Sequence, residues 1–287
     1  MPYSYNDLYL ETRRLLRNRG IDAYSLEARI LTAYAAGKTP EAFLRDIYLY
    51  ATDAVETKLA ALIERRLRGE PVAYITNSWD FYGLRFTVTP DVLIPRTDTE
   101  VLVDTSIAEL KDRPEARILD LCAGSGCIGS AIAANVPEAH VVMADNSVKA
   151  LEICRENVYL NGLESRVSFM MWDVFTPPPV LLGSFDLVVC NPPYIKSAEL
   201  RALDVSVRDY EPVTALDGGD DGLAFYRAIL GHRSGICRPN AVLCFEVGAG
   251  QSEDVRELMT VAGFRDVDGV FDSGGIERVV RGVVAPD

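Results

Sequence analysis

The sequence predicts an α/β fold in which a mainly parallel sheet carries helices on both faces and follows a small helical bundle. From Ala116 onward, short apolar runs alternate with helical segments, which is typical of a parallel sheet. Residues 3–70 instead show only helical spacing of their apolar positions. The tail from Phe264 to Val283 turns at Ser273-Gly274-Gly275, which indicates an antiparallel hairpin closing the sheet.

At 287 residues the chain can form a full α/β domain and a smaller one. We expect a helical domain over residues 1–70, a β-hairpin linker over 71–95 and a catalytic domain over 96–287. In the helical domain, Asp22 or Ser25 is expected to cap the helix that follows Gly20. Thr39-Pro40-Glu41 supplies a cap, a proline at the first helical position and an acidic residue to a further helix.

The remaining elements follow from apolar spacing and turn residues. Aromatic and aliphatic residues around Gly83 predict the hairpin, and Thr97 or Asp98 is expected to cap the helix that follows it. Strands are predicted near residues 116–121, 140–145, 167–172, 185–190 and 241–247. Helices are predicted near residues 127–135, 147–161, 220–237 and 251–262.

Composition excludes several classes of protein. The chain is 48% hydrophobic and 25% charged, has no apolar run as long as a membrane span, and does not begin with a basic and then apolar segment. We therefore expect a cytosolic, ordered protein that does not enter a membrane. Six cysteines without a C-x-x-C pair and only two histidines, His140 and His232, argue against disulfides, a metal site or a Ser-His triad.

Charge is distributed unevenly along the chain. The net charge is −13, of which residues 1–70 carry +1 and residues 71–287 carry −14. A strongly acidic catalytic half repels phosphate backbones at long range. This distribution argues against DNA or RNA as the substrate.

The stretch Leu187 to Ile195 contains the clearest chemical signal. An apolar run typical of a buried parallel strand ends at Asn191-Pro192-Pro193-Tyr194. A residue before proline avoids the helical region, so Asn191 is expected to be extended at the carboxyl end of the strand. The prolines fix the backbone and lack N–H groups, so their carbonyls are rigid acceptors for an N–H₂ group. A simple strand-ending turn is the alternative, but this tetrapeptide at a strand tip favours a functional site.

Ile118 to Ile128 predicts a strand, a loop of small residues and the start of a helix. Small residues such as Gly124 and Gly126 allow a ligand to lie against the turn, and the amino terminus of the helix favours a negative group. Such a turn is a weak signal alone, because dinucleotide-binding folds use similar ones. The third glycine of G-x-G-x-x-G and the Lys-Ser/Thr of a P-loop are both missing.

The next two predicted strands also end in acidic residues. A carboxylate at Asp145 would accept hydrogen bonds from both ribose hydroxyls of a nucleoside, although capping of the helix that begins near Ser147 explains it equally well. Asp173 is placed to meet an adenine amino group, and Trp172 to stack on the ring, although such a tryptophan is more often part of the core. Adenosine, an amino-acid tail and a planar amide or amino substrate would together account for these strand ends.

This combination resembles the S-adenosylmethionine-dependent class I methyltransferases, which have a Rossmann-like fold, and nearly the whole chain resembles the release factor glutamine methyltransferase family. The stretches that carry the narrower resemblance are Gly69-Glu70-Pro71, Tyr74-Ile75, Phe81-Tyr82-Gly83-Leu84, Leu93-Ile94-Pro95-Arg96, Thr99-Glu100, Val207 to Pro212, Ala215-Leu216-Asp217-Gly218-Gly219, Phe245-Glu246-Val247-Gly248 and Glu277-Arg278. Asn-Pro-Pro-Tyr is shared with DNA and RNA amino-methyltransferases, so alone it indicates only the reaction class.

The resemblance implies a reaction and a site. The expected substrate is the side-chain amide of the glutamine in the Gly-Gly-Gln loop of peptide chain release factors, with S-adenosylmethionine as methyl donor. Asn191, Pro192 and Tyr194 are the expected catalytic residues, and with Pro193 they are expected to bind the substrate. The residues expected to bind the cofactor are Asp120, Cys122, Ala123, Gly124, Ser125, Gly126, Asp145, Asn146, Trp172, Asp173, Val174 and Asn191. No metal is expected.

The sequence departs from the family pattern at three places. Cys122-Ala123 stands where Gly-Thr is usual, Asn77 where glycine is common, and Val174 where some members carry an aromatic residue. Either Trp172 or Val174 would then contact the adenine.

The two alternative functions are a nucleic-acid amino-methyltransferase that uses the same motif and an inactive methyltransferase-like binding subunit. The intact Gly124, Asp145 and Asn191 argue against the inactive subunit. The helical segment 1–70 is expected to recognise the protein substrate; its other explanation is a structural cap.

Overall fold

The chain folds into two compact units, seen in a computed structural model that describes residues 2–113 and 115–285. The smaller unit comprises Met1–Asn77 together with Asp204–Tyr210. The larger unit comprises Ser78–Leu203 and Glu211–Asp287. A short segment from the second half of the sequence therefore belongs to the helical unit, and the boundary after Asn77 falls within the expected linker.

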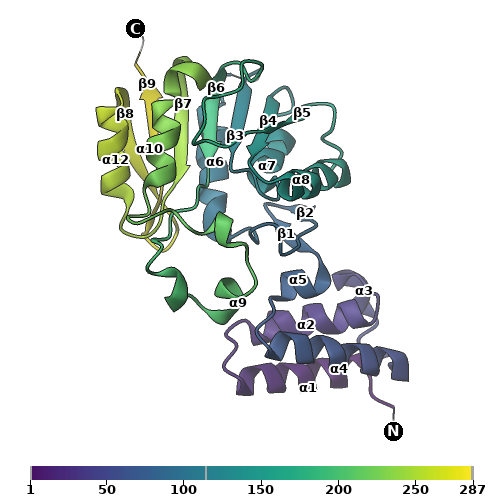
Figure 1. The fold of residues 1–287 in the computed structure, drawn as a ribbon. Helices are drawn as coiled ribbons and strands as arrows, with labels where there is room; N and C mark the ends of the chain where they lie inside the picture. Colours follow the sequence, from purple (N-terminus) through teal and green to yellow (C-terminus); the bar gives the residue numbers. More distant parts are fainter. Residues whose placement is uncertain (1, 114, 286–287) are drawn as a thin grey trace. The chain divides into compact units, whose positions relative to one another are not determined.

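The smaller unit is helical, as the apolar spacing predicts (Figure 1). Ser4 begins the first helix with a capping box, in which its hydroxyl and the carboxylate of Asp7 each accept a backbone N–H. Thr39 caps the third helix by accepting the N–H of Ala42 at 3.2 Å. Its helices are α1 (Tyr5–Asn18), α2 (Tyr24–Ala35), α3 (Pro40–Arg45), α4 (Asp53–Leu67), α5 (Val72–Thr76) and α9 (Val205–Arg208).

Two sequence predictions for this unit are wrong. Neither Asp22 nor Ser25 caps α2, because the Ser25 hydroxyl lies 3.0 Å from the Tyr9 hydroxyl and is used across the bundle. Residues 72–76 form helix α5 rather than the start of a hairpin. This helix follows Pro71, whose carbonyl accepts the first helical N–H groups, and it buries Val72 and Ile75 in the core of the bundle.

Helix α9 packs against the end of the helical region that precedes Pro71. Gly69 has a φ of +103°, and a Cβ there would lie 2.7 Å from Val205 Cγ1. The Tyr210 hydroxyl donates to the carbonyl of Arg68 at 3.2 Å. Only glycine fits this close approach, so Gly69, which belongs to a stretch that carries the family resemblance, is a packing position.

The larger unit is built on a seven-stranded sheet in the order β5-β4-β3-β6-β7-β9-β8 (Figure 1). Its first five strands in space run parallel, and β9 runs antiparallel to both of its neighbours. The predicted parallel sheet and closing hairpin are confirmed. The strands are β3 (Arg117–Leu121), β4 (His140–Asp145), β5 (Val167–Met171), β6 (Phe185–Cys190), β7 (Cys237–Glu246), β8 (Phe264–Phe271) and β9 (Glu277–Val284).

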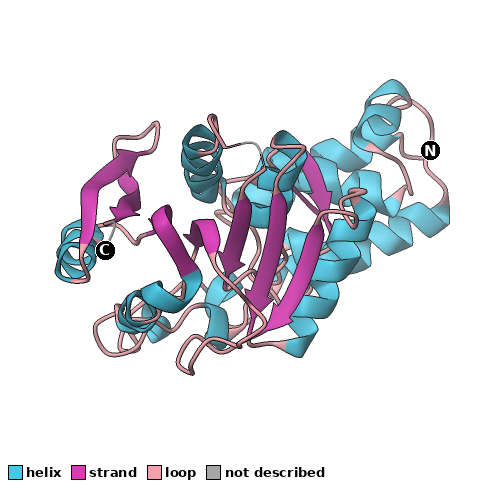
Figure 2. Ribbon diagram, turned by 90° about the horizontal axis from the view of Figure 1, so that it is seen from above, coloured by secondary structure: helices cyan, strands magenta, loops and turns pink. Residues whose placement is uncertain are grey.

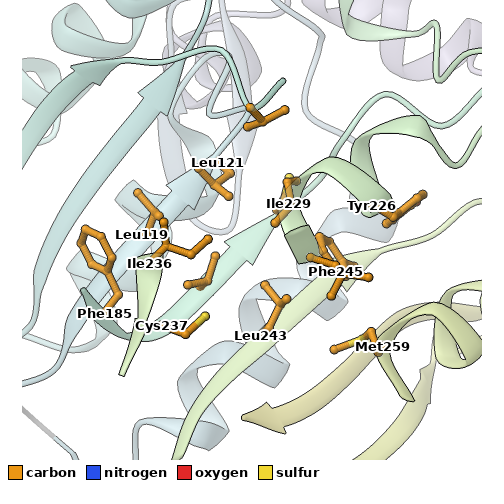
Figure 3. Close-up of a cluster of buried hydrophobic side chains, with 14 of the residues drawn as sticks. Leu119, Leu121, Phe185, Tyr226, Ile229, Ile236, Cys237, Leu243, Phe245 and Met259 are labelled. Carbon is orange, nitrogen blue, oxygen red and sulfur yellow. The ribbon is translucent and has the colours of Figure 1, made fainter. Parts of the chain in front are cut away.

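Helices cover both faces of this sheet, as predicted (Figure 2). Leu119 and Leu121 point into an apolar cluster with Tyr226 and Met259, which come from the helices of one face (Figure 3). Asp120 lies between the two leucines and points to the opposite face, where Gly129 donates to it. The helices are α6 (Glu100–Glu109), α7 (Cys127–Asn135), α8 (Val148–Leu160), α10 (Ala224–Gly231), α11 (Arg233–Ile236) and α12 (Ser252–Val261).

The expected hairpin is present but short. Strands β1 (Trp79–Phe81) and β2 (Leu84–Phe86) pair antiparallel around Tyr82 and Gly83, which both have positive φ. Along the described chain, no helix has the length and apolar character that crossing a membrane requires.

Two helix predictions in the larger unit differ from the structure. The helix expected over 220–237 is divided into α10 and α11, and it begins only at Ala224, because Gly222 has a φ of +76°. Neither Thr97 nor Asp98 caps α6. A 3₁₀ turn, η1 (Thr97–Thr99), precedes that helix, and the Thr99 side chain makes no cap. The Thr99 hydroxyl instead accepts a hydrogen bond from Asn191.

Candidate active site

One pocket of the larger unit collects the carboxyl ends of the parallel strands. It holds about 890 Å³ of empty space, open solvent at its mouth included. It is lined by Asp91, Val92, Leu93, Pro95, Arg96, Thr99, Cys122, Ala123, Gly124, Ser125, Cys127, Ile128, Asp145, Asn146, Ser147, Ala150, Trp172, Val174, Asn191, Pro193, Pro212, Thr214, Ala215 and Phe225. Most residues expected from the sequence to bind cofactor therefore share one cavity.

Asn191 lies at one end of this pocket, directly after β6. Strand β6 lies between β3 and β7, and its last residue, Cys190, pairs with Leu121 and Phe245. Asn191 Nδ2 donates to Thr99 Oγ1 at 3.3 Å. Thr99 therefore holds the nitrogen of the amide and does not occupy its oxygen, Oδ1. The side chain is half-buried, so its carbonyl oxygen is available to a ligand in the pocket.

The prolines and tyrosine after Asn191 are held by a second loop. Ile195 bridges to Asp217, and a Cβ on Gly218 would lie 2.7 Å from Tyr194 Cα. Gln251 Nε2 donates to the Tyr194 carbonyl at 2.9 Å. The Asp-Gly-Gly stretch is therefore a backbone support for Asn-Pro-Pro-Tyr, since no larger residue fits at Gly218. Pro192 and Tyr194 do not line the pocket, whereas Pro193 does.

The Tyr194 ring ends on a buried acid. Its hydroxyl donates to Glu246 Oε1 at 3.4 Å, and Glu246 is only 2% exposed at the end of β7. Burial is the main cause that raises the pKa of Tyr194, and the negative charge of Glu246 adds to it. The tyrosine therefore stays a neutral donor across the physiological pH range.

The small-residue loop after β3 also lines the pocket. Cys122 has a φ of +55°, an uncommon conformation for a residue with a side chain, and Gly124 and Gly126 also have positive φ. A Cβ on Gly124 would meet only Cys122 O at 3.9 Å, so this glycine faces open space. Gly126 faces away from the pocket, because a Cβ there would lie 2.5 Å from the Cys154 sulfur.

Asp145 joins this loop to the end of β4. Its Oδ2 accepts the N–H of Gly124 and its Oδ1 accepts the N–H of Ser147, each at 2.9 Å. The helix cap itself is Ser147, whose hydroxyl accepts from Ala150. Burial raises the pKa of Asp145, and the two N–H groups partly offset this effect. Asp145 is therefore not the helix cap that the sequence offered as an alternative; it lines the pocket and orders the backbone around it.

Asp120 lies behind the wall rather than in it. It is fully buried, its Oδ2 accepts the N–H of Gly129 at 2.9 Å, and its Oδ1 has no partner among the described residues. Burial raises its pKa to about 7; the Gly129 hydrogen bond lowers it and the charge of Asp145 raises it. The geometry assigns Asp120 to the packing of helix α7 on β3.

Apolar side chains also line the pocket. Trp172 and Val174 both line the pocket, together with Phe225 from α10, which the sequence did not suggest. The Trp172 indole donates to the carbonyl of Thr176 at 3.1 Å. Asp173 does not line the pocket, because its carboxylate accepts the N–H of Phe175 in a local turn.

An ion pair supports the mouth of the pocket. Glu211 is 4% exposed and pairs with Arg96, and it also accepts the N–H of Ile94 at 3.2 Å. Arg96 lines the pocket. Sequence reasoning gave no individual roles to Thr99, Arg96, Glu211, Phe225 or Glu246, although four of them fall in stretches that carry the family resemblance. Among the described residues, no His, Cys, Asp and Glu cluster suited to a metal ion occurs.

Comparisons with known proteins cover both units. Residues 98–206 match the methyltransferase small domain and residues 7–76 match the PrmC N-terminal domain. A release factor glutamine methyltransferase of Geobacter sulfurreducens is 40% identical over 280 residues, covering 94% of this chain and 93% of the relative. One of Agrobacterium fabrum is 37% identical over 275 residues, covering 94% of each chain.

A solved structure supports the fold alone. The hMettl16 catalytic domain, solved in complex with the MAT2A 3′UTR hairpin 6, covers 89% of this chain and 95% of its own, with a TM-score of 0.57. The two sequences are only 16% identical. This likeness supports the fold and says nothing about the substrate.

Proposed function

The chain belongs to the release factor glutamine methyltransferase family, and from this membership we propose that it methylates the side-chain amide of the glutamine in the Gly-Gly-Gln loop of peptide chain release factors. The observation that carries the proposal is the position of Asn191. Its amide ends the central strand of the sheet and lines the same pocket as the small-residue loop and Asp145. A methyl donor and an amide acceptor can therefore meet in one cavity.

The pocket residues fit S-adenosylmethionine, which when bound supplies an electrophilic methyl group. Each Asp145 oxygen accepts one backbone N–H and keeps a lone pair for a ribose hydroxyl. Val174, Trp172 and Phe225 offer an apolar wall for a purine. Gly124 leaves open space beside the amino-terminal end of α7, where a carboxylate is favoured.

At the other end, Asn191 and Pro192 orient the nitrogen that is methylated. An amide nitrogen is a poor nucleophile because its lone pair is delocalised into the carbonyl, so alignment supplies much of the rate. We assign Asn191 Oδ1 and the Pro192 carbonyl to accept the two amide hydrogens. These acceptors stabilise the positive charge that develops on nitrogen, and loss of one N–H proton restores a neutral amide. Tyr194 packs against the amide plane.

The helical unit is assigned to recognition of the protein substrate. Exposed tyrosines gather where residues 3–6 run beside residues 47–51: the N–H of Ala51 donates to the Tyr3 carbonyl at 2.8 Å, and Tyr50 bridges to Ser4. Tyr48 is 80% exposed and Tyr50 is 69% exposed. Exposed tyrosines are enriched at protein interfaces, so this surface suits a protein partner.

Methyl-label transfer to purified release factor, ribosomal RNA and DNA, side by side, tests the reaction. We expect labelling of the release factor only, and no labelling when its Gly-Gly-Gln glutamine is changed. The acidic charge of residues 71–287 supports this expectation, because a nucleic-acid enzyme must hold phosphates. If DNA or RNA were labelled and release factor were not, the reaction class would stand but the proposed substrate would be wrong. No labelling by a folded, cofactor-bound protein would favour an inactive binding subunit.

A pair of tyrosine variants tests the recognition role. The double variant Tyr48→Ala, Tyr50→Ala is expected to raise KM for the intact release factor about tenfold, since losing packed tyrosines at an interface typically costs 1–2 kcal/mol or more. Affinity for S-adenosylmethionine should stay unchanged. Tyr159→Ala in α8 is the matched control, because Tyr159 is 65% exposed on the larger unit. Equal kinetics for both variants would place recognition elsewhere.

A further inference from the structure

The orientation of the Asn191 amide is set by a residue far away in the sequence. A side-chain amide can present either its oxygen or its nitrogen to a ligand, and only the oxygen accepts an N–H from a substrate amide. Thr99 Oγ1 accepts from Asn191 Nδ2 at 3.3 Å. Thr99 is 2% exposed, so water does not compete freely for this hydroxyl.

A buried acid, Glu246, lies close enough for the Thr99 hydroxyl to lower its pKa. A hydroxyl carries one proton, so a threonine that accepts from Asn191 must donate elsewhere. Glu246 lies beside it, and the interaction of the Thr99 hydroxyl with this carboxylate favours the ionised form. Tyr194 donates to Glu246 Oε1, while Oε2 has no partner within the part of the chain that the structure describes. The same carboxylate therefore accepts from Tyr194 of the motif and is influenced by Thr99, which accepts from Asn191.

We propose that Thr99 and Glu246 are positioning residues that fix the Asn191 amide with its oxygen facing the substrate. The carboxylate accepts the Thr99 proton, the Thr99 oxygen then accepts Asn191 Nδ2–H, and Asn191 Oδ1 is left to accept a substrate N–H. This role deepens the proposed function and rests on it, because it selects a substrate group that donates hydrogen bonds. Neither residue needs to touch the substrate.

The chain of hydrogen bonds has this direction only when Glu246 is ionised. Burial raises the pKa of Glu246 to about 7; the charge of Asp98 adds to this, while the Thr99 hydroxyl, Arg278 and the Tyr194 hydroxyl lower it. Arg278 pairs with Asp98 at 2.7 Å, and Cys127 and Tyr226 also face the carboxylate. A protonated Glu246 offers a donor of its own, so Thr99 no longer has to donate. Turnover should therefore rise with pH through an apparent pKa near 7.

Thr99→Val and Thr99→Ser separate positioning from packing. Valine keeps the shape and removes the hydroxyl, whereas serine keeps the hydroxyl. We expect Thr99→Val to lower kcat on release factor by at least about tenfold with little change in cofactor affinity, and Thr99→Ser to recover most of that loss. Thr105→Val is the matched control, because Thr105 is a buried threonine of α6 that bonds only to the Val101 carbonyl at 2.7 Å. Its kcat should equal that of the unaltered protein.

The same substitutions in an Asn191→Ala background test whether Thr99 acts through Asn191. The loss caused by Thr99→Val should disappear there, because the group that it orients is gone. An equal loss in both backgrounds, or a Thr99→Ser variant as slow as Thr99→Val, would overturn the proposal.

Glu246→Gln keeps the test decisive if Thr99→Val fails to fold. We expect this variant to lose the rise of kcat with pH that the unaltered protein shows near pH 7. A rise that persists in Glu246→Gln, or a flat profile in the unaltered protein, would contradict the role of Glu246. An active unaltered protein with insensitive variants overturns this inference alone. An unaltered protein that labels no release factor overturns the proposed function, and the inference with it.

Discussion

The two ends of the pocket are held together in different ways. At the cofactor end, Asp145 is fixed by the backbone N–H groups of Gly124 and Ser147. Gly124 lies in the turn after β3, and Ser147 lies in the turn after β4. At the substrate end, Asn191 and Tyr194 are fixed by side chains of Thr99 and Glu246, from other parts of the sequence. Only proline removes a backbone N–H, whereas a side-chain network depends on the identity of each member. We therefore expect the substrate end to be the more fragile.

Each end also contains one fully buried acid, and their surroundings differ. Asp120 accepts a backbone N–H and stands behind the pocket wall, while Glu246 accepts from a side-chain hydroxyl next to the catalytic motif. Burial raises both pKa values to about 7. Protonation of Asp120 should therefore alter stability, whereas protonation of Glu246 should alter turnover. Four predictions, ordered by their effect on activity, test this contrast.

Asn191→Ala should have the largest effect. It removes a hydrogen bond that is strongest in the transition state, so kcat should fall by about 10²–10³-fold while cofactor affinity changes little. Steady-state kinetics on release factor and calorimetry with S-adenosylmethionine measure the two quantities. Asn135→Ala, an exposed asparagine of α7, is the control. If affinity and kcat/KM fell by the same factor, Asn191 would be a cofactor ligand instead.

Gly218→Ala should follow. Its Cβ would lie 2.7 Å from Tyr194 Cα and 2.8 Å from the Pro193 carbonyl oxygen, so the Asn-Pro-Pro-Tyr backbone must move. A displacement of this kind costs about 10²-fold in turnover. Gly231→Ala is the matched control, since a Cβ at Gly231 meets nothing within 4 Å. Equal turnover in both variants would show that the support of the loop is not needed.

Asp145→Asn should weaken S-adenosylmethionine binding by about 1–3 kcal/mol, because a neutral amide replaces the charged acceptor of the ribose hydroxyls. Turnover at saturating cofactor should change less than it does in Asn191→Ala. Calorimetry measures the affinity directly. Unaltered affinity would mean that Asp145 serves only to order Gly124 and Ser147.

Asp120→Asn should change stability and leave turnover nearly unaltered. Burial raises the pKa of Asp120 to about 7, so the folded state holds a proton that the unfolded state releases near its ordinary value of 3.8. The free energy of unfolding should therefore decrease as pH rises from about 4 to 7, by about 1.4 kcal/mol for each unit by which the pKa is raised. Denaturant unfolding at several pH values should show a smaller decrease in Asp120→Asn. An unchanged decrease would assign the titration to another group.

Local patterns explain how much of the fold could be predicted. The bounds of β4, β6 and α7 agree with the sequence prediction at both ends, because a buried parallel strand and a helix after a glycine turn are defined by neighbouring residues. The helix predicted over 220–237 begins only at Ala224, after Gly222. That glycine is needed where a Cβ would lie 2.4 Å from the Tyr194 carbonyl oxygen, a contact that spacing cannot reveal.

The same distinction applies to the site. Asn191 and Asp145 stand out because each follows an apolar strand directly. Thr99 appears only in a stretch that carries the family resemblance and has no individual role there, since its partner lies 92 positions away. Phe225 joins the pocket through the return of α10 to the sheet, which no local motif encodes. The residue types can be read from the sequence, but their proximity in the folded chain cannot.

The inclusion of Asp204–Tyr210 in the helical unit limits how evolution or an engineer can exchange that unit. The chain passes between the two units after Asn77, after Leu203 and after Tyr210. The helical unit is therefore built from two separate segments of the sequence. A chimaera joined only near Asn77 would separate Gly69 and Arg68 from Val205 and Tyr210, their partners in packing and hydrogen bonding. A transplant that keeps the helical unit intact must carry both segments from the same parent.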